Sequence, residues 1–444
     1  MSLLNLFRLN LSKVQKERII RNFNSESYLN ITVIISQIFF PPLMIMIYGL
    51  EKFGIWIFIT AIPTSLAILN FNINGAAKTE MSIYFNKNKK KKVSQIFTCS
   101  VFSTLCVLFL LIVSSSLLFF FSDFKLNILK SLNYNELNII FFCVFASFHL
   151  DLLNGIFKTG LIYKGNLHVD NNISIFCDVF TKLLIIIFGL ISTNLTYAAV
   201  GFMVGSISKL FIYYYYYLNY NRQNSLFLIN YFSIKQIIKL FKLSTSYYFE
   251  SLHNLFKNSF QIIIIGIFFN AQILGMINTF KTMFYFFPSR ILNMINRVAT
   301  YEFTKMYSKK KIGQLNKFFV NYIKIILISV CTYVIFSLIL GELIYNFWLS
   351  NSYIFDYKLL LLIIFDISFI ILSYNISIIN RSTNNFFRIS TMSLVINVII
   401  FLATYILFLN NFDYQILFLL NLIGSILLFI FCINEVKKLQ KKFI

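Results

Sequence analysis

Long apolar stretches alternate with short polar connections along the whole chain. A helix that crosses a bilayer needs about 20 mostly apolar residues. Twelve stretches meet this requirement, at residues 28–50, 54–73, 95–121, 137–157, 172–191, 196–218, 243–269, 271–297, 317–340, 357–379, 389–409 and 413–433. The pattern predicts an all-α integral membrane protein with twelve transmembrane helices. A mean hydropathy of +0.75 over 444 residues leaves no room for a large soluble domain.

The 39 Lys and Arg residues are concentrated on every second connection. Both tails and the connections after even-numbered stretches are rich in them. The connections after odd-numbered stretches hold only Lys52, Lys125 and Lys130, and Lys358 lies at the very start of the tenth stretch. Because short loops rich in Lys and Arg stay in the cytoplasm, both termini are predicted to be cytoplasmic. The same rule explains the formal charge of +23 without any bound nucleic acid.

The chain divides into two halves of six stretches each. Glu80 is followed by a lysine run that starts at Lys87, and half a chain later Glu302 is followed by a run that starts at Lys309. Six spans per half give both halves the same orientation, which predicts a pseudo-twofold axis along the membrane normal. The predicted parts are a basic amphipathic N-terminal segment (1–27), an N-lobe (28–218), a cytoplasmic interfacial linker (219–242), a C-lobe (243–433) and a basic cytoplasmic tail (434–444).

The sequence shows no pattern typical of a metal site, a cofactor site or a catalytic site. The six cysteines show no CxxC spacing, and the three histidines are too scattered to form a metal site. The longest predicted outer connections, at about 122–136 and 341–356, are too short to fold into a catalytic domain. The sequence therefore predicts no catalytic residues, no metal, no cofactor and no enzymatic activity.

Ionisable residues inside the spans are the strongest functional signal. Each costs about 2.5–3.5 kcal/mol at the bilayer centre, so such side chains should face a hydrated cavity or each other. The cations are Lys182, Lys209, Lys257, Lys281 and Arg290, although span depth places Arg290 close to the cytoplasmic boundary. The candidates for binding a coupling ion are Asp178, Glu250, Asp366 and His253. The surplus of cations suits an anionic substrate.

Two local spacings sharpen this interpretation. Asp178 and Lys182 are four residues apart and share a helix face. Glu250, His253 and Lys257 follow at i, i+3 and i+7, which makes one polar stripe on an apolar helix. Either group could instead be a structural ion pair that fixes helix packing. The pair of His149 with Asp151 in the fourth span is a weaker signal.

Four segments resemble a known family. Residues 49–56 (GLEKFGIW) resemble the G-x-E-x-Y/F-G-x-W segment between the first two spans of Wzx-type O-antigen flippases. These flippases belong to the multidrug/oligosaccharidyl-lipid/polysaccharide (MOP) exporter superfamily. Residues 69–73, 263–275 and 341–348 resemble further segments of the same family.

Three positions depart from the family pattern. Asn70 and Asn72 stand where Asp and Gly are frequent, and Tyr301 stands where Pro is common. The departures affect details at the ends of the second and eighth spans. The resemblance implies a MATE/MOP-like fold of two six-helix lobes.

The resemblance also implies a function in lipopolysaccharide or capsule assembly. Such flippases move a polyprenyl-diphosphate-linked oligosaccharide across the bacterial cytoplasmic membrane by alternating access, coupled to an ion. The implied partners are this anionic lipid, the membrane lipids, and a glycan polymerase or glycosyltransferases. Nucleic acid is not among them.

Three other functions stay open at this point. A multidrug or toxin antiporter of the same superfamily would need a dominant buried carboxylate, whereas lysines prevail here. A membrane enzyme of glycan assembly, such as a polymerase or ligase, would need a large outer loop. A scaffold protein is the third alternative. The glycan, the coupling ion, the oligomeric state and the conformational state do not follow from the sequence.

Overall fold

A computed structural model gives the fold. The structure describes residues 13–66, 73–121, 127–129, 132–221, 226–290, 296, 299, 303, 312–349, 355–382 and 386–441. Every regular element within these ranges is helical, as predicted. The call for a basic amphipathic segment at 1–27 and the departures at Asn70, Asn72 and Tyr301 fall wholly or partly outside them.

Nine helices in the described ranges are long and apolar enough to cross a membrane. They are α1 (Lys13–Ser65), α3 (Lys90–Phe121), α4 (Tyr134–Ile162), α5 (Leu167–Ile191), α6 (Leu195–Tyr220), α11 (Ile312–Trp348), α12 (Tyr357–Ile376), α14 (Phe387–Leu409) and α15 (Gln415–Lys441). This finding confirms a multi-pass membrane protein. The count of twelve spans stays a prediction, because α1 contains two predicted spans and the seventh and eighth are assembled from shorter pieces.

The remaining elements of the described ranges are shorter. They are α2 (Ile73–Asn86), α7 (Ile234–Leu255), α8 (Gln261–Phe268), α9 (Ala271–Lys281), α13 (Ile378–Ser382), the 3₁₀ turns η3 (Asn127–Leu129) and η4 (Ile229–Tyr231), and the π-helical turns η5 (Phe256–Phe260) and η6 (Thr282–Phe286). The seventh span is thus α7–η5–α8, and the eighth begins with α9–η6. The π-helical turns contain Lys257 or directly follow Lys281, and such turns are frequent at functional sites.

The backbone of α1 reverses direction at Gly49, where φ is +81°. L-residues with side chains rarely adopt this conformation, so glycine suits the turn. Five residues later, a Cβ on Gly54 would lie 1.9 Å from the carbonyl oxygen of Ala271, the first residue of α9. The two glycines of the GLEKFGIW segment therefore permit a sharp turn whose backbone packs directly on the C-lobe.

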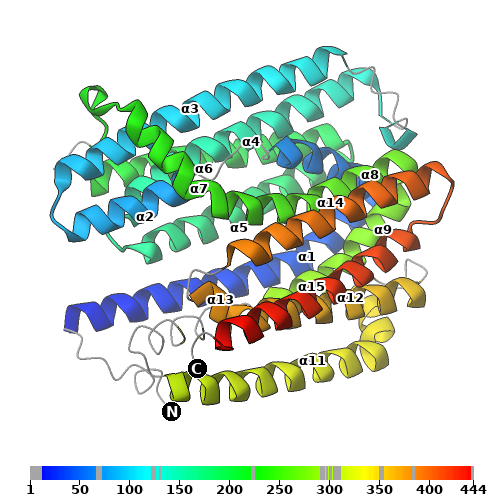
Figure 1. Ribbon diagram of the computed structural model, residues 1–444. Helices are drawn as coiled ribbons and strands as arrows, with labels where there is room; N and C mark the ends of the chain where they lie inside the picture. The colour runs from blue at the N-terminus through cyan, green and yellow to red at the C-terminus, as the bar shows by residue number, and fades with distance from the viewer. Residues whose placement is uncertain are drawn as a thin grey trace.

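In Figure 1 the helices α3, α4 and α6 lie in one half of the bundle, and α11, α12 and α15 lie in the other. Helix α1 runs between the halves and packs against both α5 and α9. The start of α1 and the end of α15 lie toward the same end of the bundle, which we call the predicted cytoplasmic end. The turn at Gly49 marks the opposite, predicted outer end.

Helix α7 connects the two halves. It begins against α2 and α3 and continues to α14 (Figure 1). Leu240 is fully buried against the α2–α3 core, and Lys239 pairs with Glu80 of α2 at 2.7 Å. Residues 234–242 of the predicted linker thus form one continuous helix with the start of the predicted seventh span. The lobe boundaries stay a prediction.

Asp356 joins two helices at the predicted outer end. Its carboxylate caps α12 by accepting a hydrogen bond from the Leu359 N–H at 3.0 Å. It also accepts hydrogen bonds from the Tyr414 hydroxyl at 2.7 Å and from the Gln415 amide at 3.0 Å, next to α15. Burial alone would raise the pKa of Asp356, but these hydrogen bonds outweigh it and lower the pKa below its ordinary value.

Candidate functional site

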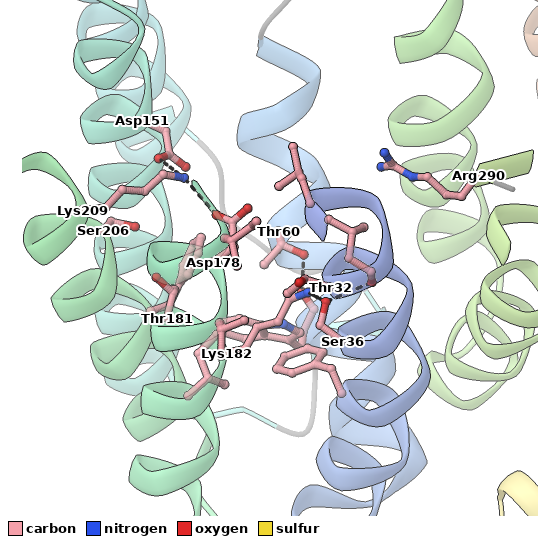
Figure 2. A pocket seen from close by; sticks show the side chains of 18 residues that line it. Thr32, Ser36, Thr60, Asp151, Asp178, Thr181, Lys182, Ser206, Lys209 and Arg290 are labelled. Carbon is pink, nitrogen blue, oxygen red and sulfur yellow. Dashed lines mark hydrogen bonds and ion pairs between the residues drawn. The ribbon is translucent and has the colours of Figure 1, made fainter. Parts of the chain in front are cut away.

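A cavity of about 400 Å³ lies between α1, α5 and α6, and we call it the N-lobe cavity. Figure 2 shows its lining. The hydroxyls of Thr32, Ser36 and Thr60 line it from both halves of α1. The charged residues of the lining are Asp151, Asp178, Lys182, Lys209 and Arg290. The cavity therefore combines hydroxyls with charges of both signs.

One amine in this cavity is held by two carboxylates. Lys209 of α6 lies 3.1 Å from an oxygen of Asp151 and 3.3 Å from an oxygen of Asp178 (Figure 2). The Lys209 side chain is 15% exposed, whereas those of Asp151 and Asp178 are 41% and 45% exposed. We call these three residues the N-lobe cluster. It carries one more carboxylate than amine, and its carboxylates are partly exposed.

The predicted pair between Asp178 and Lys182 does not form. Within the described residues, the ion-pair partner of Asp178 is Lys209, which reaches it from the neighbouring helix. Lys182 turns toward α1 instead, donates to the Ser36 hydroxyl at 2.6 Å and lies 5.9 Å from the centre of the Phe40 ring (Figure 2). Helix spacing predicted a shared face, but the competing lysine on α6 was not readable from that spacing.

A second cavity, of about 430 Å³, lies between α7, the eighth span, α12, α13 and α14. We call it the C-lobe cavity. Three strong cations line it, Lys257, Arg290 and Arg381, and no carboxylate stands among the described residues of its lining. Asn, Ser, Tyr and Phe side chains supply the rest of its polar and aromatic surface.

A buried ion pair and a further buried amine lie beside this cavity. Lys257 lies 3.3 Å from Asp366 of α12, and their side chains are only 11% and 5% exposed. Lys281 is buried as well, and its amine and that of Lys257 lie 5.9 and 5.7 Å from the centre of the Tyr285 ring. In the part of the chain that the structure describes, Lys281 makes no ion pair. Lys257, Lys281 and Asp366 form the C-lobe cluster, which has one more amine than carboxylate.

The polar stripe of the seventh span is formed in part. His253 and Lys257 both line the C-lobe cavity. His253 Nδ1 lies 2.8 Å from the side-chain amide of Asn397 and 3.4 Å from the carbonyl oxygen of Ser393, both on α14. The side chain of Glu250 lies outside the described residues.

Arg290 borders both cavities. It belongs to the helical residues that follow η6, yet it lines the N-lobe cavity as well as the C-lobe cavity. Figure 2 shows it across from Asp178 and Lys182. Its guanidinium forms no ion pair within the described ranges. Span depth predicts a peripheral position for Arg290, whereas the structure places it on the linings of both cavities.

Sequence reasoning missed two contributors. Asp151 was noticed only beside His149, because its real partner Lys209 lies two spans later. Arg381 follows the tenth predicted span, in a connection where the positive-inside rule accounts for its charge. The signal that could have found Arg381 is its place between Tyr374 and Phe386, since an arginine enclosed by aromatic residues is rarely a plain loop charge.

Residues 19–301 match the sequence family described as "Polysaccharide biosynthesis protein". No curated protein matches the chain. Among solved structures, the fold is similar to the inward-facing conformation of a multidrug resistance MATE family transporter of the MOP superfamily. The TM-score is 0.60 at 13% identity, and the match covers 93% of this chain and 96% of that chain. An outward-facing conformation of a MATE family transporter of that superfamily gives a TM-score of 0.59, 13% identity and 96% coverage of both chains.

A third similar structure is a MOP superfamily transporter from Pyrococcus furiosus, whose binding pocket is described as having reverse polarity. It gives a TM-score of 0.54, 14% identity and 96% coverage of both chains. At such identities these matches establish the fold alone. The arrangement of helices is that of MATE/MOP transporters.

Proposed function

Because this chain belongs to the polysaccharide biosynthesis protein family of membrane transporters, we propose that it is a flippase for a polyprenyl-diphosphate-linked oligosaccharide. It would carry an O-antigen-type or capsule-type repeat unit across the bacterial cytoplasmic membrane. The observation that supports this substrate best is Arg290, a cation that lines both cavities and forms no ion pair within the described residues.

The diphosphate would bind between Lys182 and Arg290. Both line the N-lobe cavity, and the partner of Lys182 is the neutral hydroxyl of Ser36 rather than a carboxylate. Fixed cations in a cleft with low-dielectric walls attract an anion far more strongly than they do in water. The hydroxyls of Thr32 and Thr60 can add hydrogen bonds to phosphate oxygens.

Alternating access would require the lobes to part at the predicted outer end. There the second half of α1 packs on α8 and α9, and Phe58 covers Gly266. Trp348 of α11 also donates to the Ile38 carbonyl of α1 at 2.6 Å. Substrate or a coupling ion can drive this opening only by binding one state more tightly than the other.

The coupling ion would bind at the N-lobe cluster. Asp151 and Asp178 are partly exposed and outnumber Lys209, the one amine that both contact. The two carboxylates can therefore accept a proton or a sodium ion. Asp366 is already neutralised by Lys257 in a dry setting, which makes it a weaker candidate. His253 is hydrogen-bonded to α14. The role of Glu250 in binding a coupling ion stays a prediction.

A multidrug antiporter is the second candidate, because MATE transporters share the fold. The cavity linings favour the flippase, since an exporter of organic cations would present an unpaired carboxylate where Arg290 stands. Family and fold are those of transporters, so we propose no enzymatic activity. A glycan polymerase and glycosyltransferases would act on the same lipid before or after transport.

The test is rescue of surface glycan in a bacterial strain that lacks its own flippase for a matching repeat unit. Arg290→Gln should lower the rate of glycan export about 10- to 100-fold, as expected for loss of a charged hydrogen bond. Lys324→Gln is the matched control, because Lys324 is a lysine of α11 that is exposed on the surface of the bundle and lines neither cavity. Full export by Arg290→Gln, or equal loss in both variants, would contradict the proposal.

A further inference from the structure

The imidazole of His253 contacts α14 through only one of its two ring nitrogens. His253 Nδ1 lies 2.8 Å from the side-chain nitrogen of Asn397. The same nitrogen of Asn397 donates to the carbonyl oxygen of Ser393 at 2.7 Å. Asn397 is buried, and both contacts hold its amide in place. These contacts determine which nitrogen of His253 carries the ring proton.

The Ser393 carbonyl fixes the orientation of the Asn397 amide. If the amide were reversed, its oxygen would lie 2.7 Å from another oxygen that can only accept. The amide therefore turns its NH₂ group toward both partners and donates one hydrogen to each. At 3.4 Å the carbonyl is a poor acceptor for His253 Nδ1 itself. Nδ1 thus accepts a hydrogen bond, which requires a neutral imidazole with its proton on Nε2.

The Nε2–H group of His253 is left for a ligand. The hydrogen bonds of His253 within the described residues both involve Nδ1. His253 lines the C-lobe cavity. The contacts with α14 therefore hold a neutral hydrogen-bond donor in one orientation at the cavity wall, where an acceptor atom of a ligand would complete it.

Two side-chain amides continue this polar row along the seventh span. Asn254 directly follows His253, and Asn258 lies four residues after Asn254 on the same helix face. Both line the C-lobe cavity. Within the described residues neither amide has a hydrogen-bond partner, and Asn258 Oδ1 is buried. A buried acceptor without a donor costs about 1–3 kcal/mol, so a ligand that donates to Asn258 would remove this cost.

These three side chains match a sugar better than an ion. They are neutral and offer both donors and acceptors, and a sugar hydroxyl can both donate and accept. A metal cation would use only the amide oxygens, and a diphosphate would use only the N–H groups. Phe286 also lines the cavity and offers an apolar face for a sugar ring.

We propose that the C-lobe cavity binds a neutral sugar of the glycan. The Nε2–H group of His253 donates to a sugar oxygen, and Asn254 and Asn258 bind sugar hydroxyls. Asn397 is a positioning residue that acts through His253. The inference rests on the proposed function, because the sugar would belong to the same lipid-linked substrate. It assigns His253 a role in sugar recognition rather than in binding a coupling ion.

The first test is the tautomer of His253, measured by ¹⁵N NMR at neutral pH. The sample is the purified full-length protein in nanodiscs, labelled on its three histidines. The variant His253→Gln identifies which signals belong to His253. The wild type should show the neutral Nε2–H tautomer, and Asn397→Ala should give a mixture of the two neutral forms. An Nδ1–H tautomer or a charged imidazolium in the wild type would overturn the inference.

The second test is equilibrium binding of neutral disaccharides, built from hexoses and N-acetylhexosamines, to the same preparation. The wild type should bind at least one of them. His253→Ala should weaken that binding about 2- to 10-fold, as expected for one neutral hydrogen bond. Asn258→Ala should have an effect of similar size, and it decides the outcome if His253→Ala does not fold. Full binding by both variants, or no binding of any probe by the wild type, would overturn the inference.

A double-mutant cycle separates positioning from packing. Asn397→Ala should weaken sugar binding in the wild type but not in the His253→Ala background, where no imidazole remains to be positioned. An equal loss in both backgrounds would overturn the assignment of Asn397. His149→Ala is the matched control, because His149 is a histidine of α4 that lines neither cavity. It should bind the probe as tightly as the wild type.

Inorganic pyrophosphate separates this inference from the proposed function. Arg290→Gln should weaken pyrophosphate binding, and His253→Ala should leave it unchanged. Weaker sugar binding with intact pyrophosphate binding in His253→Ala supports a sugar site that is distinct from the diphosphate site. A wild type that binds pyrophosphate but none of the disaccharides would overturn the inference and leave the flippase proposal standing. A wild type that binds a disaccharide but not pyrophosphate would instead count against the diphosphate substrate.

Discussion

The two lobes use the same kinds of charged side chains in opposite proportion. The N-lobe cluster holds one amine between two carboxylates, whereas the C-lobe cluster holds one carboxylate near two amines. The N-lobe carboxylates are about two-fifths exposed, and Asp366 is almost fully buried. A count of buried lysines over the whole chain therefore misses a difference between the lobes. The acidic cluster of the N-lobe is partly exposed, whereas the basic cluster of the C-lobe is buried.

Hydration decides what each cluster can do. A hydrated carboxylate can bind or release a cation at a small cost in free energy, because water screens the change in charge. A dry ion pair resists any such change, since removing one partner leaves an unpaired charge in a medium of low dielectric. The N-lobe cluster is therefore suited to ion exchange, and the C-lobe cluster to a fixed positive field beside the cavity.

The most damaging single change should be Asp366→Ala. It leaves the buried amine of Lys257 without its carboxylate partner, and breaking a buried pair costs about 3–5 kcal/mol. Asp178→Ala should cost less than about 1 kcal/mol, because Asp178 is hydrated and Lys209 keeps Asp151. Thermal unfolding of both variants in the same detergent measures the difference. Equal losses would remove the contrast between the clusters.

Transport should respond in the reverse order. Asp178→Asn removes a charge from the proposed coupling site, and coupling free energies of about 1–3 kcal/mol correspond to about a 5- to 150-fold loss of ion-driven transport. Its thermal stability should stay close to that of the wild type. The measurement is glycan export together with its dependence on the ion gradient. Unchanged gradient dependence in Asp178→Asn would place coupling elsewhere.

The double variant Lys257→Met/Asp366→Leu asks whether the dry pair is needed at all. Replacing a buried pair with apolar residues of similar size is often neutral or stabilising, so most of the stability lost in Asp366→Ala should return. Export should remain reduced if the positive field of the C-lobe cluster takes part in transport. Full recovery of both properties would show that the pair only fixes the packing of α12 on the seventh span.

Asp356 lies outside the predicted membrane spans, and its loss should have a modest effect on stability. Asp356→Ala should cost about 1 kcal/mol at neutral pH, as for other lost helix caps. Because the folded pKa lies below the ordinary value of 3.8, this stability is present above about pH 4 and is lost as the pH falls through the folded pKa. The gap in melting temperature between wild type and Asp356→Ala should therefore shrink below about pH 4. A gap that stays constant on acidification would contradict this role.

The spans could be predicted from the sequence because hydropathy and loop charge report directly on the membrane. The reversal at Gly49 was also readable, since a glycine pair within a family-like segment indicates a tight turn. The π-helical turns at Phe256–Phe260 and Thr282–Phe286 were not, because no local propensity marks them.

The site could be predicted only as a set of residues. Lys182, Lys209, Lys257 and Arg290 do line the cavities, but their partners depend on packing between helices. The nearest acid in sequence to Lys182 is Asp178, yet the acid is taken by Lys209 from α6. Arg381 was not predicted as a lining residue for a different reason: the positive-inside rule already accounted for its charge as that of a cytoplasmic connection.

Arg290 is carried by one lobe and borders the cavity of the other. A phosphate held by Arg290 and Lys182 together would tether two bodies that must separate during transport. The spacing of the lobes would then depend on ligand concentration, and each departure of the ligand would free the lobes to move. Distance measurements between spin labels on the two lobes, with and without pyrophosphate, would record that dependence directly.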